Sequence, residues 1–462
     1  MLAALSIAGV CLAQSDGVPK TWVDKDTGHR VTRLTDEPGS SGFYFNVNAY
    51  TPDGMQMVYT APDGIHALDL SSRRTKLVVP SPPPAVAAAA SSFRDGIHTI
   101  IVGRKTGAVF FSKFDGERKA NVLYKADLDS GAVTKLVTLP PRASVATINA
   151  DETLGVGTWD ETEAGAQQEF GRATTGPATT SAGVRGAERG GAGSLVQPEG
   201  KGAMMERRLA ARIPVVLFSI DLKTGKVNPL LHSTDWIGHM LFSPTDPDLL
   251  MYCHEGPWQK VDRIWMMHAD GTHKELIHKR TMAMEIAGHE FWGLDGKTIW
   301  YDWQYPKGED FFVAGYNLET HQRIAYHLQR NEWSIHFNLT QGETLFAGDG
   351  GDPGQVAKAA DGQWIELFHP QMLSTNGISA PDFWQPGIFH SEHLVNMAGH
   401  NYRLEPNIRF SPDKKLVIFT SNIFGKSYVF GVNVNVETDA KAAEIESTPQ
   451  LASRYAQASE AK

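Results

Sequence analysis

Residues 288–302 read Gly-His-Glu-Phe-Trp-Gly-Leu-Asp-Gly-Lys-Thr-Ile-Trp-Tyr-Asp: a short apolar run, a polar turn and a second apolar run. This pattern predicts a β-hairpin, because two strand-like segments flank a turn rich in Gly and Asp. The same pattern recurs at residues 48–60, 238–253, 335–348 and 406–420. The chain is therefore expected to repeat one hairpin unit many times.

The spacing of these hairpins is typical of a β-propeller. From His239 to His289 is 50 residues, from His289 to His336 is 47, and from His336 to Asn407 is 71. Periods of about 40 to 50 residues, with four short strands each, are those of propeller blades, and the longer interval requires an insertion.

Residues 94–109 and 146–159 hold weaker versions of the unit, which brings the number of units to seven. The apolar run at 21–34 is expected to pair with the last blade and close the ring, which hides the edges of the sheets. We therefore predict an all-β fold, a seven-bladed β-propeller.

The remaining segments predict the domain organisation. Residues 1–13 are apolar apart from Ser6 and resemble a secretory signal peptide, which places the mature protein in the periplasm or outside the cell. The rest is predicted as one propeller over 14–436, a flexible excursion near 161–212, an ordered loop over one face near 350–399, and a polar tail at 437–462.

Composition excludes several classes of protein. The chain has 462 residues, 43 Lys+Arg and 52 Asp+Glu, a net charge of −9, and no apolar run of the roughly 20 residues that a membrane span needs. Nucleic-acid binding is not expected, because no basic face is evident. Removal of the leader with Cys11 would leave Cys253 alone, so no intrachain disulfide is expected. Any anionic ligand must be attracted by a local site.

Equivalent positions of the repeat carry the strongest signal for a site. His239, His289, His336 and Asn407 each lie five residues before the turn position of their hairpin. The innermost strand of a blade starts beside the central channel, so these side chains are expected to ring one mouth. With Glu405 on the same side of its strand as Asn407, they predict a metal site. The alternative is that these histidines bond to the backbone and plug the channel.

Other polar residues are weaker candidates. His254 at a strand end, and His400, Tyr402 and Arg403 before the last hairpin, are predicted to contact a sugar at the channel mouth. Arg212, at the end of the first insertion, is available to clamp a carboxylate if that end folds over the channel. The alternative for each is a structural turn or a solvated side chain. No Walker, GxGxxG or GxSxG motif is present.

Several of these motifs resemble one family. Residues 21–35, 44–45 and 48–54 are similar to the N-terminal blades of oligogalacturonate lyases, and 236–239, 253–257 and 289–292 are similar to the middle blades, in the same order. The resemblance spans most of the chain outside the two insertions. It implies a seven-bladed propeller that cleaves short pectic uronides by β-elimination with a divalent metal, typically manganese.

The resemblance also implies roles for individual residues. His239 matches the catalytic base and His289 a metal-binding histidine, while Arg212 is an approximate match to an arginine that assists catalysis. Where the family has a His-Pro-His run, this sequence has Glu405-Pro406-Asn407, and Tyr402 stands in the position of a Gln. This oxygen-rich set suits Mn²⁺ and is also compatible with Ca²⁺ or Mg²⁺.

Together these observations predict an exported lyase for small anionic uronic-acid oligosaccharides. Elimination removes the C5 proton beside a carboxylate, a neutral histidine accepts a proton near neutral pH, and a cation stabilises the developing charge. Two alternatives stay open: a non-catalytic propeller that binds a carbohydrate or a protein, and a lyase for a different uronide.

Overall fold

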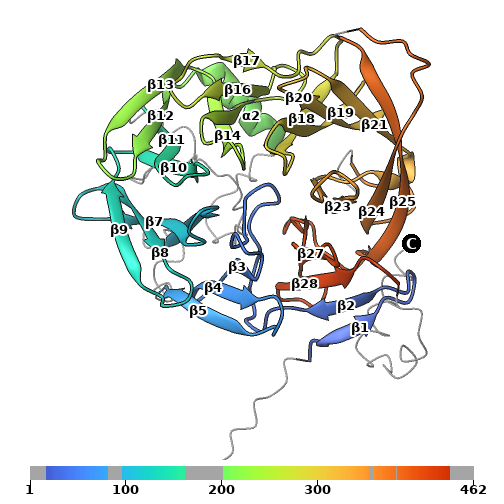
Figure 1. The fold of residues 1–462 in the computed structure, drawn as a ribbon, viewed down its shortest axis with the longest axis horizontal. Coiled ribbons are helices and arrows are strands. Elements are labelled where there is room, and N and C mark those ends of the chain that lie inside the picture. Colours follow the sequence, from blue (N-terminus) through green and yellow to red (C-terminus); the bar gives the residue numbers. More distant parts are fainter. Residues whose placement is uncertain (1–16, 82–95, 162–200, 353–356, 381, 437–462) are drawn as a thin grey trace, which may run out of the picture.

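The computed structural model describes residues 17–81, 96–161, 201–352, 357–380 and 382–436. Its strands form mostly antiparallel sheets arranged in a ring around a central axis (Figure 1). The signal-like segment at 1–13 and the tail at 437–462 lie outside the described residues. Within the part of the chain that is described, no helix has the length and apolar character of a membrane span.

The first three blades follow one another along the chain. Blade 1 holds β3 (Gln56–Ala61), β4 (Gly64–Asp69) and β5 (Thr75–Pro80). Blade 2 holds β6 (Ile97–Val102), β7 (Val109–Asp115), β8 (Ala120–Ala126) and β9 (Val133–Thr138). Blade 3 holds β10 (Ala143–Ile148), β11 (Leu154–Asp160), β12 (Val215–Asp221) and β13 (Val227–Ser233).

Blades 4 to 6 continue the ring. Blade 4 holds β14 (Trp236–Phe242), β15 (Leu249–Glu255), β16 (Ile264–His268) and β17 (Glu275–Leu276). Blade 5 holds β18 (Ile286–Trp292), β19 (Thr298–Gln304), β20 (Phe311–Asn317) and β21 (Arg323–Leu328), followed by the 3₁₀ turn η1 (Arg330–Glu332). Blade 6 holds β22 (Phe337–Leu339), β23 (Phe346–Gly348), β24 (Trp364–Met372) and β25 (Trp384–Asn396), and the parallel pairing of β21 with β25 joins blades 5 and 6 into one sheet.

Blade 7 closes the ring with strands from both ends of the chain. It holds β26 (Arg409–Phe410), β27 (Leu416–Ser421) and β28 (Tyr428–Asn433), and β2 (Arg30–Arg33) pairs with β28 on its outer side, followed by β1 (Thr21–Val23). This pairing leaves no gap between the first and last blades. The predicted seven-bladed β-propeller and its closure by residues 21–34 are confirmed.

The core lies between the blades, because both faces of a middle strand are covered. In β19, Trp300 packs edge-on against Phe346 of blade 6, with ring centroids 5.1 Å apart. Tyr301, the next residue, lies in the apolar cluster that contains Met251 and Met266 of blade 4. Successive strand residues point to opposite faces, so a continuous apolar run is what a strand between two blades requires.

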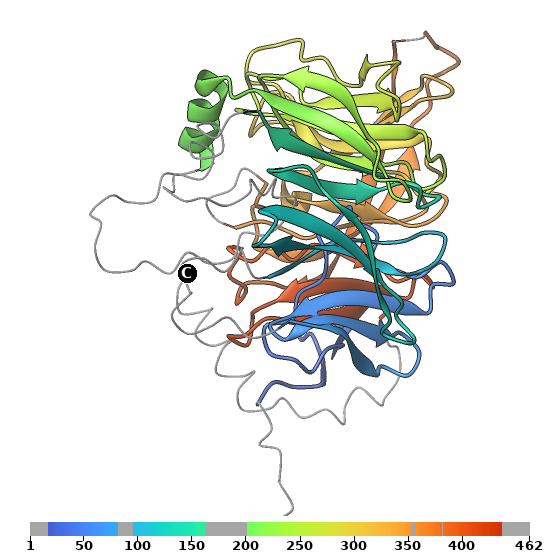
Figure 2. The same cartoon turned by 90° about the vertical axis from the view of Figure 1, so that its left-hand side faces the viewer.

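The two insertions differ from the predictions. Residues 162–200 lie outside the described residues, but the end of the first insertion forms α2 (Lys201–Ala211), a helix that the sequence did not predict. Figure 2 shows α2 on one face of the ring. The prediction that 350–399 forms a loop over one face was wrong: β24 and β25 lie there and complete blade 6, with Ile365 opposite Val395. The strand signal was weak because most residues of β25 are only partly buried or exposed, and many of them are polar.

Candidate active site

Three of the four equivalent positions share an unusual backbone conformation. His239, His289 and Asn407 have positive φ angles of 45°, 46° and 53°. In β14 and β18 the register with the neighbouring strand shifts at the histidine, which is a β-bulge. A bulge re-aims a side chain, and a non-glycine residue with positive φ is uncommon and concentrated at functional sites. The repeat therefore places the same strained feature in blades 4, 5 and 7.

His289 and His336 form a pair, with ring centroids 4.7 Å apart. His289 Nδ1 lies 3.2 Å from Asp302 Oδ2, and His336 Nδ1 lies 2.7 Å from Asp349 Oδ2. A carboxylate on Nδ1 fixes the orientation of an imidazole and leaves Nε2 to face a ligand, as is usual for histidines that bind a metal. Tyr44 Oη, 3.2 Å from His336 Nε2, lies at this same place.

Burial and charge set different protonation states in this pair. Burial lowers the pKa of His289 well below its ordinary value, and the neighbouring His336 and Lys201 lower it further. Burial also lowers the pKa of His336, but the Asp349 carboxylate outweighs this and raises it overall. Burial raises the pKa of the Asp302 carboxyl. His289 is therefore a neutral imidazole, the form that binds a cation.

His239 lies between two buried carboxylates on the adjacent wall. Its Nε2 is 3.0 Å from Glu255 Oε1 and its Nδ1 is 3.4 Å from Glu290 Oε1. Glu255 is also paired with Arg263, at 3.1 Å. Burial by itself lowers the pKa of His239, but the two carboxylates outweigh burial and raise it to about 9. The carboxylates hold the ring and increase its basicity.

Residues 43–47 bring these histidines together from the centre of the channel. The Tyr44 ring lies 5.8 Å from His239 and 5.2 Å from His336, and the Phe45 ring stacks on His336 at 4.5 Å. The Arg409 guanidinium donates to the carbonyl oxygens of Tyr44 and Val47, at 3.0 and 2.9 Å. This segment therefore forms one side of the histidine cluster.

The last blade contributes less directly than predicted. The Asn407 side chain hydrogen-bonds to the backbone: Oδ1 accepts from the Phe45 amide at 3.1 Å, and Nδ2 donates to the Glu405 carbonyl at 3.0 Å. The Glu405 carboxylate lies close enough to raise the pKa of Tyr44, after the larger effect of burial. The part of the chain that the structure describes holds no group of three or more His, Cys, Asp or Glu arranged to bind a metal.

Arg212 and His254 lie at the edge of this mouth and share one carboxylate. Arg212, with φ 48°, pairs with Asp235, and His254 Nδ1 lies 3.2 Å from the other oxygen of Asp235. The helix α2 is anchored beside them, with the Arg208 guanidinium 4.2 Å from the Trp236 ring centroid. Among the described residues, neither Arg212 nor His254 forms a hydrogen bond or an ion pair with His239.

The three candidates before the last hairpin are placed differently from one another. His400 is buried, and its ring nitrogens lie 2.7 Å from the Leu404 carbonyl and 3.0 Å from Ser421 Oγ, so both are used within the blade. Tyr402 is buried too and donates its hydroxyl to the Asp349 carbonyl at 2.9 Å. Arg403 is exposed. Burial gives His400 and Tyr402 structural roles rather than the predicted contact with a sugar.

Several residues of this cluster were missed by reasoning from the sequence. Asp302 and Asp349 each follow their histidine by 13 residues, because the second strand of the hairpin returns beside the first. That repeated spacing is a signal from which both could have been found. Glu255, Glu290 and the contact role of Tyr44 have no such signal.

The burial of His400 gives a prediction for acid stability. Burial lowers the pKa of His400 from 6.5 to about 4, although the bond to the Leu404 carbonyl acts in the opposite direction. The neutral ring therefore stabilises the fold above pH 6.5, and this contribution, about 3 kcal/mol, is lost as the pH falls from about 6.5 to about 4. We expect His400→Gln to flatten the pH dependence over this range, as measured by urea unfolding at several pH values. Equal slopes in both proteins would contradict this role.

Comparisons with known proteins point to one family. A family model described as oligogalacturonate lyase matches residues 208–437. The oligogalacturonate lyase of Dickeya dadantii (strain 3937) is 29% identical over 216 residues, which is 46% of this chain and 54% of that protein. The oligogalacturonide lyase of Pectobacterium atrosepticum is 27% identical over 224 residues, with the same two shares. The chain spans about half the length of the curated relatives it matches.

Solved structures extend the likeness in fold to nearly the whole chain. An oligogalacturonate lyase in complex with manganese is 21% identical, with a TM-score of 0.65 over 92% of this chain and 97% of that one. An oligogalacturonate lyase from Vibrio parahaemolyticus is 20% identical, with a TM-score of 0.66 over 90% and 96%. These structures share the propeller fold, and the motifs of the middle blades lie within the segment that the family model matches. The chain therefore resembles oligogalacturonate lyases in sequence over residues 208–437 and in fold over nearly its whole length.

Proposed function

We propose that this protein cleaves short oligogalacturonides by β-elimination at the histidine mouth of the propeller. The observation that carries the proposal is the pair of imidazoles, His289 and His336, each held at Nδ1 by a buried carboxylate, with a third imidazole, His239, on the adjacent wall. The likeness to oligogalacturonate lyases supports a pectic oligosaccharide as the substrate.

The paired imidazoles of His289 and His336 suit a divalent cation, which we propose to be Mn²⁺, although the described residues hold no third ligand in place beside them. His289 and His336 would hold it through Nε2, since their Nδ1 atoms face Asp302 and Asp349. The Glu405 carboxylate, which acts electrostatically on both imidazoles, would supply an oxygen ligand. When bound, such a cation neutralises the uronate carboxylate and stabilises the negative charge that develops next to it.

Side chains of this chain supply the remaining steps. His239, once deprotonated, accepts the C5 proton at a ring nitrogen, and the resulting imidazolium is stabilised by Glu255 and Glu290. Loss of that proton forms the C4–C5 double bond and breaks the C4–O bond, and the expelled glycosidic oxygen takes up a proton from the solvent to become a hydroxyl. Lys201 of α2, which acts electrostatically on His289 and Glu255, adds positive charge at this mouth. Arg212 is a second candidate to meet the anionic substrate if its pairing with Asp235 opens.

Metal removal tests the proposal. The purified protein with Mn²⁺ is expected to increase the ultraviolet absorbance of digalacturonate and trigalacturonate, because an unsaturated uronate forms. EDTA should abolish the increase, and added Mn²⁺ should restore it. An increase in absorbance with a different uronide, and none with galacturonides, would reassign the substrate. No increase with any uronide would reject the proposed lyase activity.

His289→Ala is expected to lower both bound manganese and kcat/KM, the latter by about 100-fold or more, because one of two oriented imidazoles is lost. His232→Ala is the matched control, since the His232 side chain is 65% exposed on β13. The variants should unfold at similar temperatures. Full metal content and activity in His289→Ala would exclude the proposed ligand.

A further inference from the structure

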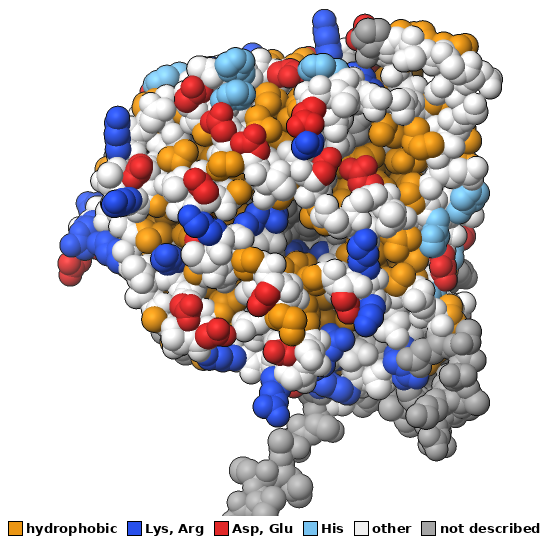
Figure 3. Space-filling model, in the orientation of Figure 1, with side chains coloured by type: hydrophobic (Ala, Val, Ile, Leu, Met, Phe, Trp, Pro, Cys, Tyr) orange, Lys and Arg blue, Asp and Glu red, His pale blue; other side chains and the backbone are white. Residues whose placement is uncertain are grey.

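A cavity of about 460 Å³ opens at the mouth opposite the histidines. It is lined by residues that follow the histidines on the same inner strands, among them Leu241, Phe291 and Asn338. Figures 1 and 2 place α2 on the far face, and Figure 3 shows the near face, hollowed at its centre. Phe45 separates the two mouths, because it stacks on His336 and also lines the cavity. The volume lies within the range of about 300–1,000 Å³ that is common for small-molecule sites.

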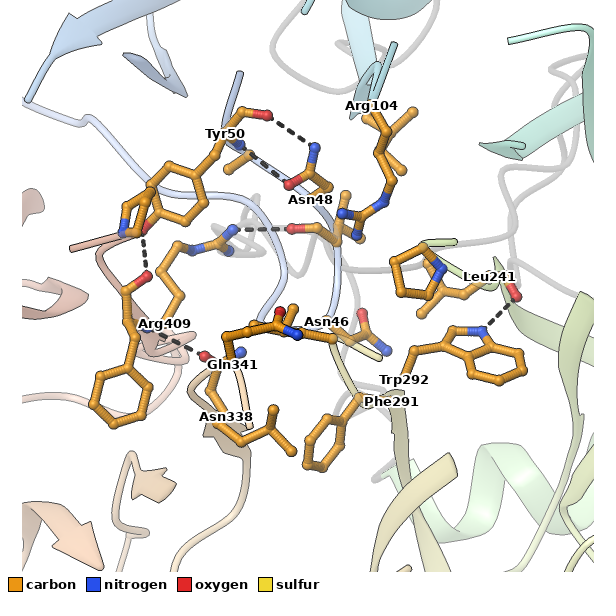
Figure 4. A pocket seen from close by; sticks show the side chains of 18 of the residues that line it. Asn46, Asn48, Tyr50, Arg104, Leu241, Phe291, Trp292, Asn338, Gln341 and Arg409 are labelled. Carbon is orange, nitrogen blue, oxygen red and sulfur yellow. Dashed lines mark hydrogen bonds between the residues drawn. The ribbon is translucent and has the colours of Figure 1, made fainter. Parts of the chain in front are cut away.

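The lining of this cavity carries positive charge only. Arg104, Arg409 and Lys414 contribute to it, and none of its lining residues is Asp or Glu. In Figure 3, Lys or Arg side chains are visible in and around the hollow, and Figure 4 shows Arg104 and Arg409 reaching the cavity from different blades. In a chain whose net charge is −9, a wholly cationic cavity is a local attractor for anions.

None of the cationic groups of the cavity is paired with a carboxylate among the described residues. The Arg104 guanidinium makes no hydrogen bond or ion pair with the described residues, and burial lowers its pKa to about 10. Arg409 donates to backbone carbonyls of residues 43–47 and Lys414 Nζ to the Gln341 carbonyl at 2.9 Å, so neither is paired with a carboxylate. A bound anion would offset the cost of burying the Arg409 guanidinium and, in part, that of Arg104.

The other lining groups suit a sugar ring. Phe291 and Trp292 present aromatic surface, and Trp292 Nε1 is already bonded to the Leu241 carbonyl, at 3.0 Å. Asn48 and Asn338 use their amides to hold the surrounding loops, which keeps the cavity in shape. Aromatic faces with a few polar groups at the rim are what a hydroxylated ring requires.

We propose that this cavity is a second binding site, for a small sugar acid whose carboxylate meets Arg104 and Lys414. Binding of an anion here does not depend on the proposed function. The choice of a sugar acid over other small carboxylates does rest on it.

The test is calorimetric titration of the full chain, carried out in EDTA and in a His289→Ala, His336→Ala background that disables the opposite mouth. Galacturonate is expected to bind, galactose to bind at least about tenfold more weakly, and the affinity for galacturonate to fall as salt rises. Arg104→Met should weaken galacturonate at least about tenfold, Lys414→Met should weaken it less, and Arg104→Lys should retain part of the affinity. Lys113→Met, which removes one charge from an exposed position on β7, should change nothing.

Three results would overturn the proposal. Arg104→Met and its parent could bind galacturonate with equal affinity, galactose could bind as tightly as galacturonate, or inorganic phosphate could bind while galacturonate does not. The circular dichroism spectrum and unfolding temperature of each variant show whether it is folded. If Arg104→Met does not fold, Lys414→Met and Arg104→Lys still test the proposal. The two proposals fail separately. Absence of lyase activity with galacturonate bound at Arg104 rejects only the proposed reaction, whereas active enzyme without this binding rejects only the second site.

Discussion

His239→Ala is expected to lower kcat/KM for oligogalacturonide cleavage by about 100- to 10,000-fold, the usual contribution of a general base. The physical reason is that no other imidazole lies between two carboxylates at this mouth among the described residues: Glu255 and Glu290 flank His239 alone. The measurement is the initial rate of ultraviolet absorbance growth with Mn²⁺ present. Bound manganese should stay near the wild-type amount, which separates loss of the base from loss of a metal ligand.

The pH profile gives the same assignment an independent readout. A base must lose its proton to act, and the pKa of His239 is raised to about 9, so the rate should rise with pH up to about 9. Glu255→Gln removes the nearer carboxylate, which should lower the pKa of His239 and move the rising limb to lower pH. Full activity in His239→Ala, or a pH–rate profile of Glu255→Gln with its rising limb at the same pH as in the wild type, would contradict the role of His239 as the base. His232→Ala again serves as the control for loss of an imidazole.

Val31→Asp is expected to lower the free energy of unfolding by more than about 3 kcal/mol, because it buries a carboxylate without a partner. Val31 is 0% exposed on β2, opposite Val432 of β28, in the pairing that closes the ring. The measurement is equilibrium unfolding in urea. A weakened closure should also lower the cooperativity of the transition, since the N-terminal strands then lose their pairing with blade 7.

Val133→Asp provides a matched control with the same change of side chain and charge. Val133 is 49% exposed on β9, the outer strand of blade 2, so its replacement should change the free energy of unfolding by no more than about 0.5 kcal/mol. If the two variants had equal stability, closure by β2 would contribute nothing specific to the fold. Val31→Ala, which leaves a cavity but no charge, should fall between them.

Much of the fold follows from local patterns. The hairpin at 288–302 became β18 and β19, and the equivalent residues at 238–253 became β14 and β15. Such hairpins are readable because both strands and their turn lie within about 15 residues of one another, so that the pattern is uninterrupted. By contrast, β24 and β25 were missed because a long connection separates them and exposed polar residues interrupt their apolar pattern.

The candidate site was only partly predictable for the same reason. The positions of His239 and His289 follow from the repeat, and so does their shared backbone conformation. The contact of Tyr44 with His336 joins residues 292 positions apart, and no local sequence pattern predicts it. His400 shows the reverse error: a polar residue beside a predicted mouth turned out to be buried, because its partners Leu404 and Ser421 fold around it.

By itself, the sequence determined the number of blades, their closure by the N-terminal strands and the histidine positions, because a repeated local pattern places equivalent residues at equivalent points of a ring. Only the tertiary structure decided which carboxylate each histidine faces, and that Arg104, Arg409 and Lys414 meet in one cavity free of acidic residues. Those arrangements are formed between blades, by side chains from distant parts of the chain. Burial then fixes their charge states, and burial is a property of the assembled ring.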